Sequence, residues 1–192
     1  IEQPTAHTDE KSKMTGYSNE GGLDFSFRLQ KNIMGLWIIQ QVRHELGDKY
    51  SFAELADMAR SNPIPDTVDV NDNRFLAPKS MRSELHDAVG RELSDGECAY
   101  LVFNSLALSY KESLEDLESV TGKHYDTLHI FGGGCKNTLL NELTAKYTQK
   151  RVLTGPTEST ALGNLLLQMI GAKDLSDIAE GRRLVEKSFD IK

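Results

Sequence analysis

A short apolar run that ends in three glycines constrains the fold more than any other part of the chain. The run Tyr125 to Phe131 is rich in β-branched and aromatic residues and too short for a helix, so it predicts a buried strand. Gly132, Gly133 and Gly134 follow at once, and apolar spacing predicts a helix from about Asn137. Without Cβ atoms, this turn lets backbone N–H groups approach a ligand, and the helix points its positive end at the same place. The pattern favours an anion or nucleotide site, and a tight turn without a ligand is the alternative.

The same order of strand, turn and helix repeats directly downstream. Arg151 to Leu153 predicts a short strand, Thr154-Gly155-Pro156 a turn, and Thr157 to Ile170 a helix with Thr157 as its N-cap. Two successive units of this kind place both loops at the carboxyl edge of one parallel sheet, where open α/β sheets bind their ligands. The chain is therefore predicted to be an α/β protein.

At these residues the sequence resembles a known family. The segments FGGGCKNTLLNELTA and TGPTESTALGNLLLQ are similar to the carboxyl-terminal half of the FGGY carbohydrate kinases, and Asn19 to Trp37, NEGGLDFSFRLQKNIMGLW, supports the resemblance independently. The likeness extends from about Tyr17 to about Lys173. It implies an RNase H-like, actin-like ATPase domain, the carboxyl-terminal lobe of a two-lobed sugar kinase, over residues 17–192, after a linker or loop at residues 1–16.

The resemblance also implies a nucleotide site. Gly132, Gly133 and Gly134 would approach the adenosine and phosphates of ATP, and Asn137 would hydrogen-bond the adenine. The residues by themselves agree, because an asparagine in the first turn of a helix presents one donor and one acceptor to a base edge. An ordinary N-cap is the alternative for Asn137.

The catalytic residues of such a kinase are expected outside the chain. Phosphoryl transfer to a sugar requires a carboxylate that accepts the hydroxyl proton, magnesium between the phosphates, and donors around the transferred group. In the family, the catalytic aspartate and a Gly-Thr hairpin precede this segment, and neither motif occurs here. The resemblance thus implies ATP, a ketose substrate, Mg²⁺ held mainly elsewhere, and an amino-terminal sugar-binding domain. The chain, which begins at Ile1, is expected to be an inactive piece of a longer enzyme that lacks the first strands of its domain.

Several other functions are less consistent with the sequence. The glycine run lacks the third glycine of a dinucleotide fingerprint, so a hydride-transfer enzyme is the weak runner-up. A phosphate loop is absent, because Lys136 lies between Cys135 and Asn137. Two alternatives stay open: a kinase of another ketose, such as fuculose or xylulose, and a non-catalytic nucleotide-binding or dimerisation module.

Charge and cysteine content limit the ligands and the cellular compartment that are consistent with the sequence. With 22 Lys and Arg against 29 Asp and Glu, the net charge is −7, which argues against a nucleic-acid groove. Cys98 and Cys135 lack metal-ligand spacing, so a reduced cytosolic protein without a zinc site is expected. Cys135, beside the glycines, is conceivable as a nucleophile, but a small residue that fills the turn is the simpler interpretation. No run of 18 apolar residues predicts a membrane span.

The first half of the chain is predicted to be mostly helical. A buried helix is predicted over Phe27 to Leu46, and capping boxes predict helices after Ser51 and after Ser94, the second ending at Gly122. The alternation of oxygen-bearing side chains from Asp69 to Asn73 resembles a calcium loop, but a plain Asx turn is favoured because the required glycine and glutamate are missing.

Overall fold

The computed structural model describes residues 1–189, so residues 190–192 of the predicted domain lie outside the described part. The chain forms two compact units, Ile1–Tyr125 and Asp126–Lys192. No helix within residues 1–189 is long and apolar enough to cross a membrane.

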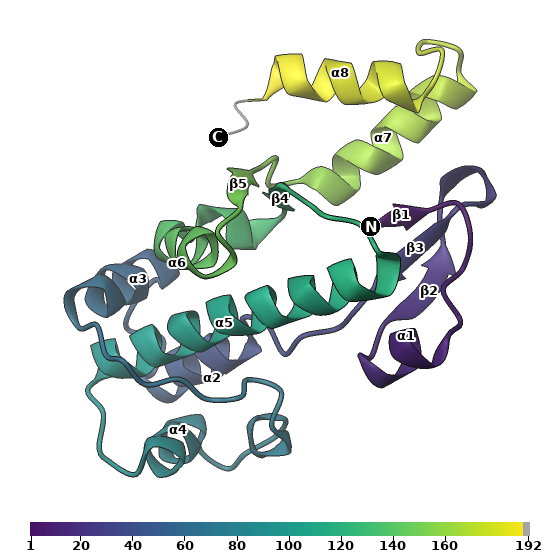
Figure 1. Cartoon of the computed structure of the whole chain (residues 1–192). Helices are drawn as coiled ribbons and strands as arrows, with labels where there is room; N and C mark the ends of the chain where they lie inside the picture. The colour runs from purple at the N-terminus through teal and green to yellow at the C-terminus, as the bar shows by residue number, and fades with distance from the viewer. Residues whose placement is uncertain (190–192) are drawn as a thin grey trace. The chain divides into compact units, whose positions relative to one another are not determined.

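The elements of the first unit surround one long helix (Figure 1). Its strands are β1 (Glu2–Gln3), β2 (Ser18–Gly21) and β3 (Phe27–Gln30), and its helices are α1 (Glu10–Met14), α2 (Trp37–Glu45), α3 (Phe52–Ser61), α4 (Met81–Val89) and α5 (Asp95–Thr121), with short 3₁₀ turns η1 (Leu23–Phe25) and η2 (Asn73–Phe75). The second unit contains β4 (Thr127–Ile130), the 3₁₀ turn η3 (Gly133–Lys136), α6 (Thr138–Thr148), β5 (Arg151–Thr154), α7 (Ser159–Gly171) and α8 (Ile178–Ser188).

A small antiparallel sheet in the order β1-β3-β2 begins the first unit. Residues 1–16, predicted as a linker or loop, supply its first strand and helix α1. The cause is pairing with a distant partner: the amino group of Ile1 donates to the Leu29 carbonyl oxygen over 2.8 Å, and the Leu29 N–H donates back to Ile1. Asp9 then caps α1 by accepting the N–H of Ser12.

The predicted helix over Phe27 to Leu46 is wrong in its first half. Residues 27–30 are strand β3, and only Trp37–Glu45 is helical. Strand pairing buries Leu29 to 1% exposure, so tertiary contacts decide a segment whose apolar pattern also fits a helix. Gly35, with a φ of +64°, separates the two elements because a left-handed residue cannot continue either one.

Helix α5 forms the centre of the first unit. Its capping box is confirmed: the Ser94 hydroxyl accepts the N–H of Glu97, and the Glu97 carboxylate accepts the N–H of Ser94. Gly122 ends the helix in a left-handed conformation, as predicted. Residues 98–107 of α5 are buried except for Tyr100, and they pack against α2 and α3. The capping box at the start of α3 is also confirmed.

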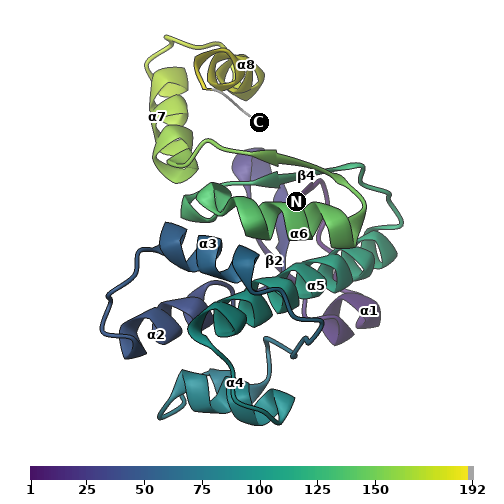
Figure 2. The same ribbon diagram turned by 90° about the vertical axis from the view of Figure 1, so that its left-hand side faces the viewer.

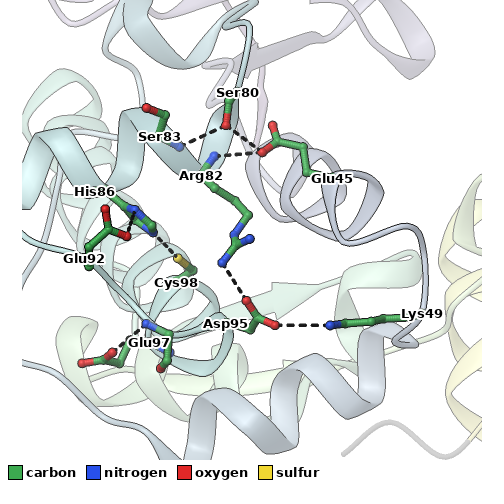
Figure 3. Close-up of polar contacts among 11 residues, drawn as sticks. Glu45, Lys49, Ser80, Arg82, Ser83, His86, Glu92, Asp95, Glu97 and Cys98 are labelled. Carbon is green, nitrogen blue, oxygen red and sulfur yellow. Dashed lines mark hydrogen bonds and ion pairs between the residues drawn. The ribbon is translucent and has the colours of Figure 1, made fainter.

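Two carboxylates connect α4 to its neighbours (Figure 3). Glu45, at the end of α2, accepts the Ser80 hydroxyl over 2.9 Å and the N–H groups of the next two residues, where α4 begins. Asp95, at the start of α5, pairs with Arg82 at 2.8 Å and with Lys49 at 3.7 Å. Because Glu45 caps a helix other than its own, the position of α4 depends on α2.

A buried thiol lies beside this network. The Cys98 sulfur lies 3.6 Å from Nε2 of His86, whose Nδ1 lies 2.8 Å from the Glu92 carboxylate (Figure 3). Burial raises the pKa of Cys98 to about 11, so the group is a neutral thiol at physiological pH. Despite the resemblance to a cysteine–histidine–carboxylate arrangement, it is inert as a nucleophile.

The second unit is a layered α/β structure. Its two strands pair in parallel, α6 packs against β5, and α7 packs against α8 (Figure 2). Helix α6 buries Leu139, Leu140 and Leu143 and leaves Tyr147 half-buried. The absence of a side chain at Gly181 lets α8 approach α7, because a Cβ there would lie 3.2 Å from Leu166.

The buried thiol predicts a specific loss of stability at alkaline pH. In the unfolded chain Cys98 releases its proton near pH 9, whereas in the fold it keeps the proton until about pH 11. The unfolded state therefore binds fewer protons in this window, and stability falls as the pH rises from 9 to 11, by up to about 2–3 kcal/mol. Urea unfolding at pH 8 and pH 11 should show this loss in the wild type, and Cys98→Ala should lose correspondingly less, because the part that comes from tyrosines with a raised pKa, such as Tyr17, remains. Equal losses in the two proteins would contradict the assignment.

Candidate functional site

Two loops meet at the carboxyl edge of the β4–β5 pair. The parallel register places Ile130 opposite Thr154, so the chain leaves both strands at the same end, as predicted. Beyond the strands, the Gly155 N–H donates to Ile130 over 2.9 Å, and the Gly132 N–H approaches the Pro156 carbonyl oxygen at 3.4 Å. The glycine turn and the loop after β5 are therefore neighbours within the second unit.

The glycine turn exposes backbone donors. Gly132 has a φ of +73°, which requires glycine in practice, and it directs the chain into the 3₁₀ turn η3. The Cys135 N–H donates to the Gly132 carbonyl oxygen over 3.1 Å and closes this turn. The N–H groups of Gly133 and Gly134 make no hydrogen bond within the described residues. A Cβ at Gly133 would meet nothing within 4 Å, so open space lies beside these donors.

Asn137 is an N-cap. Its Oδ1 accepts the Leu140 N–H over 3.0 Å, which is the alternative that the sequence left open. Its Nδ2 has no partner among the described residues. The cap does not exclude a ligand contact: the oxygen is used by the helix, while one amide donor stays available beside the glycine turn.

Cys135 occupies the middle of the turn as a half-buried residue. Its sulfur lies 3.5 Å from the hydroxyl of Thr157, and no histidine among residues 1–189 is paired with it. Thr157 was predicted to cap the helix after β5, and this prediction is wrong: α7 begins at Ser159, and its N-cap residue is Glu158, whose side chain does not cap the described helix. The Thr157 hydroxyl is directed to the turn instead, which joins the two loops.

One residue of the site was missed by the sequence analysis. Asn141 lies one helical turn after Asn137, and its Nδ2 donates to the Cys135 carbonyl oxygen over 2.9 Å. Its spacing of four from Asn137 was a usable signal, since residues four apart lie on one face of a helix. Together these residues present N–H donors at the start of a helix, a chemistry that suits phosphate or a base edge rather than a cation.

The first unit contains a separate polar cavity of about 430 Å³. It lies between a loop and α5 and is lined by Thr67, Val68, Asp69, Val70, Asn71, Ser105, Leu108, Ser109 and Glu112. The Asn71 N–H donates to Asp69 over 2.9 Å, which confirms the Asx turn. The Asn71 side-chain oxygen accepts the Met34 N–H over 3.1 Å, so it serves to fix the loop.

Comparison with known proteins gives a consistent assignment. Residues 1–172 match the family model described as the FGGY family of carbohydrate kinases, C-terminal domain. Curated relatives include rhamnulokinases from Lactiplantibacillus plantarum (45% identical, covering 92% of this chain and 37% of the relative), Halalkalibacterium halodurans (42%, covering 92% and 39%) and Bacillus subtilis (39%, covering 100% and 41%). The chain thus spans about two fifths of the length of these relatives.

Proposed function

The chain belongs to the FGGY family of carbohydrate kinases, and we propose that it forms the ATP-binding lobe of a rhamnulokinase, which transfers phosphate from ATP to O1 of L-rhamnulose. Its fold is the carboxyl-terminal lobe of the actin-like, RNase H-like sugar kinases. The observation that carries the proposal is similarity to rhamnulokinases along nearly the whole chain, at 39% to 45% identity. A domain over residues 17–192 remains part of the proposal.

In this proposal the glycine turn binds the nucleotide. Gly132 provides the left-handed bend, the free N–H groups of Gly133 and Gly134 face the adenosine and phosphates, and the free Nδ2 of Asn137 contacts the adenine. Neutral N–H donors and the positive end of α6 suit an anionic ligand. They do not suit a cation, so Mg²⁺, which neutralises charge between the phosphates, would be held mainly by parts outside this chain.

The chain's own residues would bind and orient ATP without performing the chemistry. Positioning accounts for most of the catalysis in phosphoryl transfer, and it requires a carboxylate base and the sugar held in line with the phosphate. Both are assigned to parts of the proposed enzyme outside this chain. A non-catalytic nucleotide-binding module would share the glycine turn, so activity of the longer protein is the discriminating measurement.

The first prediction is that the 192-residue chain has no kinase activity by itself. The reason is that it offers no paired base and sugar site for in-line transfer. Purified chain with ATP, Mg²⁺ and L-rhamnulose should give no product above background, whereas the longer protein should turn over. Turnover by the chain at the rate of the longer protein would contradict the division of roles.

Gly133→Val should weaken ATP binding without damaging the fold. A Cβ at Gly133 meets open space, and Gly133 is not in the left-handed region, so the variant should keep its thermal stability. In the longer enzyme the side chain would hold the nucleotide away from the N–H donors, raising KM for ATP much more than KM for the sugar. Steady-state kinetics with each substrate varied checks this. Equal effects on both KM values would argue against a nucleotide site here.

Variants of Asn137 should separate the helix cap from the ligand contact. Asn137→Ala should lose about 1 kcal/mol of stability, weaken ATP by about 1–2 kcal/mol, and reduce the preference for ATP over GTP. Asn137→Ser provides the matched control, because serine caps a helix equally well but lacks the amide donor. It should keep stability and still raise KM for ATP. If Asn137→Ala lowers stability and neither variant changes KM, Asn137 is a cap alone.

A further inference from the structure

Asn141 connects the glycine turn to α6 by one side-chain hydrogen bond. Its Nδ2 donates to the Cys135 carbonyl oxygen over 2.9 Å, and Cys135 lies inside η3. Two other contacts of the turn are longer: 3.5 Å from the Cys135 sulfur to the Thr157 hydroxyl, and 3.4 Å from the Gly132 N–H to the Pro156 carbonyl oxygen. A turn of three glycines has large conformational freedom, so an external restraint is needed to orient it.

The stability of the fold alone does not explain an asparagine at position 141, because its side-chain oxygen is unpaired. The Oδ1 atom of Asn141 is buried and has no hydrogen-bond partner among the described residues. An unpaired buried oxygen is destabilising, and an apolar side chain of similar size would avoid that penalty. The benefit of the amide lies in its donor, which fixes the Cys135 carbonyl group.

We propose that Asn141 is a positioning residue for nucleotide binding: by holding Cys135, it orients the N–H groups of Gly133 and Gly134 toward the nucleotide. This inference rests on the proposed function, since it names the residue that orders the same site. The restrained part of the site is backbone, which makes no distinction between bases. Asn141 therefore acts on ATP and GTP alike, in contrast to Asn137.

The test uses a substitution that removes the restraint together with the unpaired oxygen. Asn141→Leu should keep or raise the melting temperature, yet raise KM for ATP and for GTP by similar factors of about ten, the value of one lost hydrogen bond. The kcat value and KM for the sugar should change little. Asn141→Asp, which places a carboxylate against the Cys135 carbonyl oxygen, should raise both nucleotide KM values further. Asn164→Leu, at an exposed position of α7, is the matched control and should change none of these values.

Hydrogen exchange in the nucleotide-free 192-residue chain supplies a readout independent of activity. The Cys135 and Asn137 amides, which donate to carbonyl groups of the turn, should exchange faster in Asn141→Leu than in the wild type or in the Asn164 control. Unchanged exchange and unchanged nucleotide KM values would overturn the inference, and so would a rise in KM for ATP only, since that pattern belongs to a base contact. If the wild-type enzyme does not use nucleotides, the proposed function fails, and the exchange result still decides whether Asn141 orders the turn.

Discussion

Parallel pairing of β4 and β5 is the interaction on which the candidate site depends. It places Ile130 opposite Thr154, and the hydrogen bond from Gly155 to Ile130 extends the ladder by one more residue. Two loops that are separated in the sequence by α6 and β5 are thereby brought together at one edge. A pair of strands is marginal without further packing, and α6, whose leucines are buried, packs against β5. The position of the turn is thus a consequence of the core of the second unit.

Within the second unit, the features that the sequence predicts correctly are those determined by residues close together along the chain. The strand before the glycines, the start of α6 at Asn137 and the parallel order all follow from side-chain periodicity, glycine and a capping residue. The sequence does not predict which atoms of the two loops contact each other. Thr157 has the chemistry of an N-cap but faces Cys135, and Asn141 reads as an ordinary helical residue until the conformation of η3 is known. Such contacts depend on the turn's backbone angles, which three glycines leave almost unrestricted.

In the first unit, too, elements determined by neighbouring residues were predicted and elements that depend on distant partners were not. Helices α3 and α5 begin at their predicted capping boxes because these signals are contained in four consecutive residues. The helix predicted at Phe27 to Gln30 was wrong because strands β1 and β3 form by a pairing across 28 positions, between Ile1 and Leu29. Glu45 is a similar case, since it caps a helix that begins 36 residues later. Long-range partners of this kind leave no local pattern in a single sequence.

Asn137 caps α6 with its side-chain oxygen and is proposed to contact the base with its side-chain nitrogen, so the cap limits which base atoms it can recognise. Because Oδ1 is held by the Leu140 N–H, the amide cannot rotate by half a turn without breaking the cap, so only a donor faces outward. A fixed donor needs an acceptor on the base. The ring nitrogen N1 of adenine is an acceptor, whereas N1 of guanine carries a hydrogen, so contact there would discriminate ATP from GTP. Contact with N7, an acceptor in both purines, would not. The helix cap, an element of folding, therefore restricts base selectivity to the edge of the purine that Asn137 meets, and the ratio of the two KM values reports which edge that is.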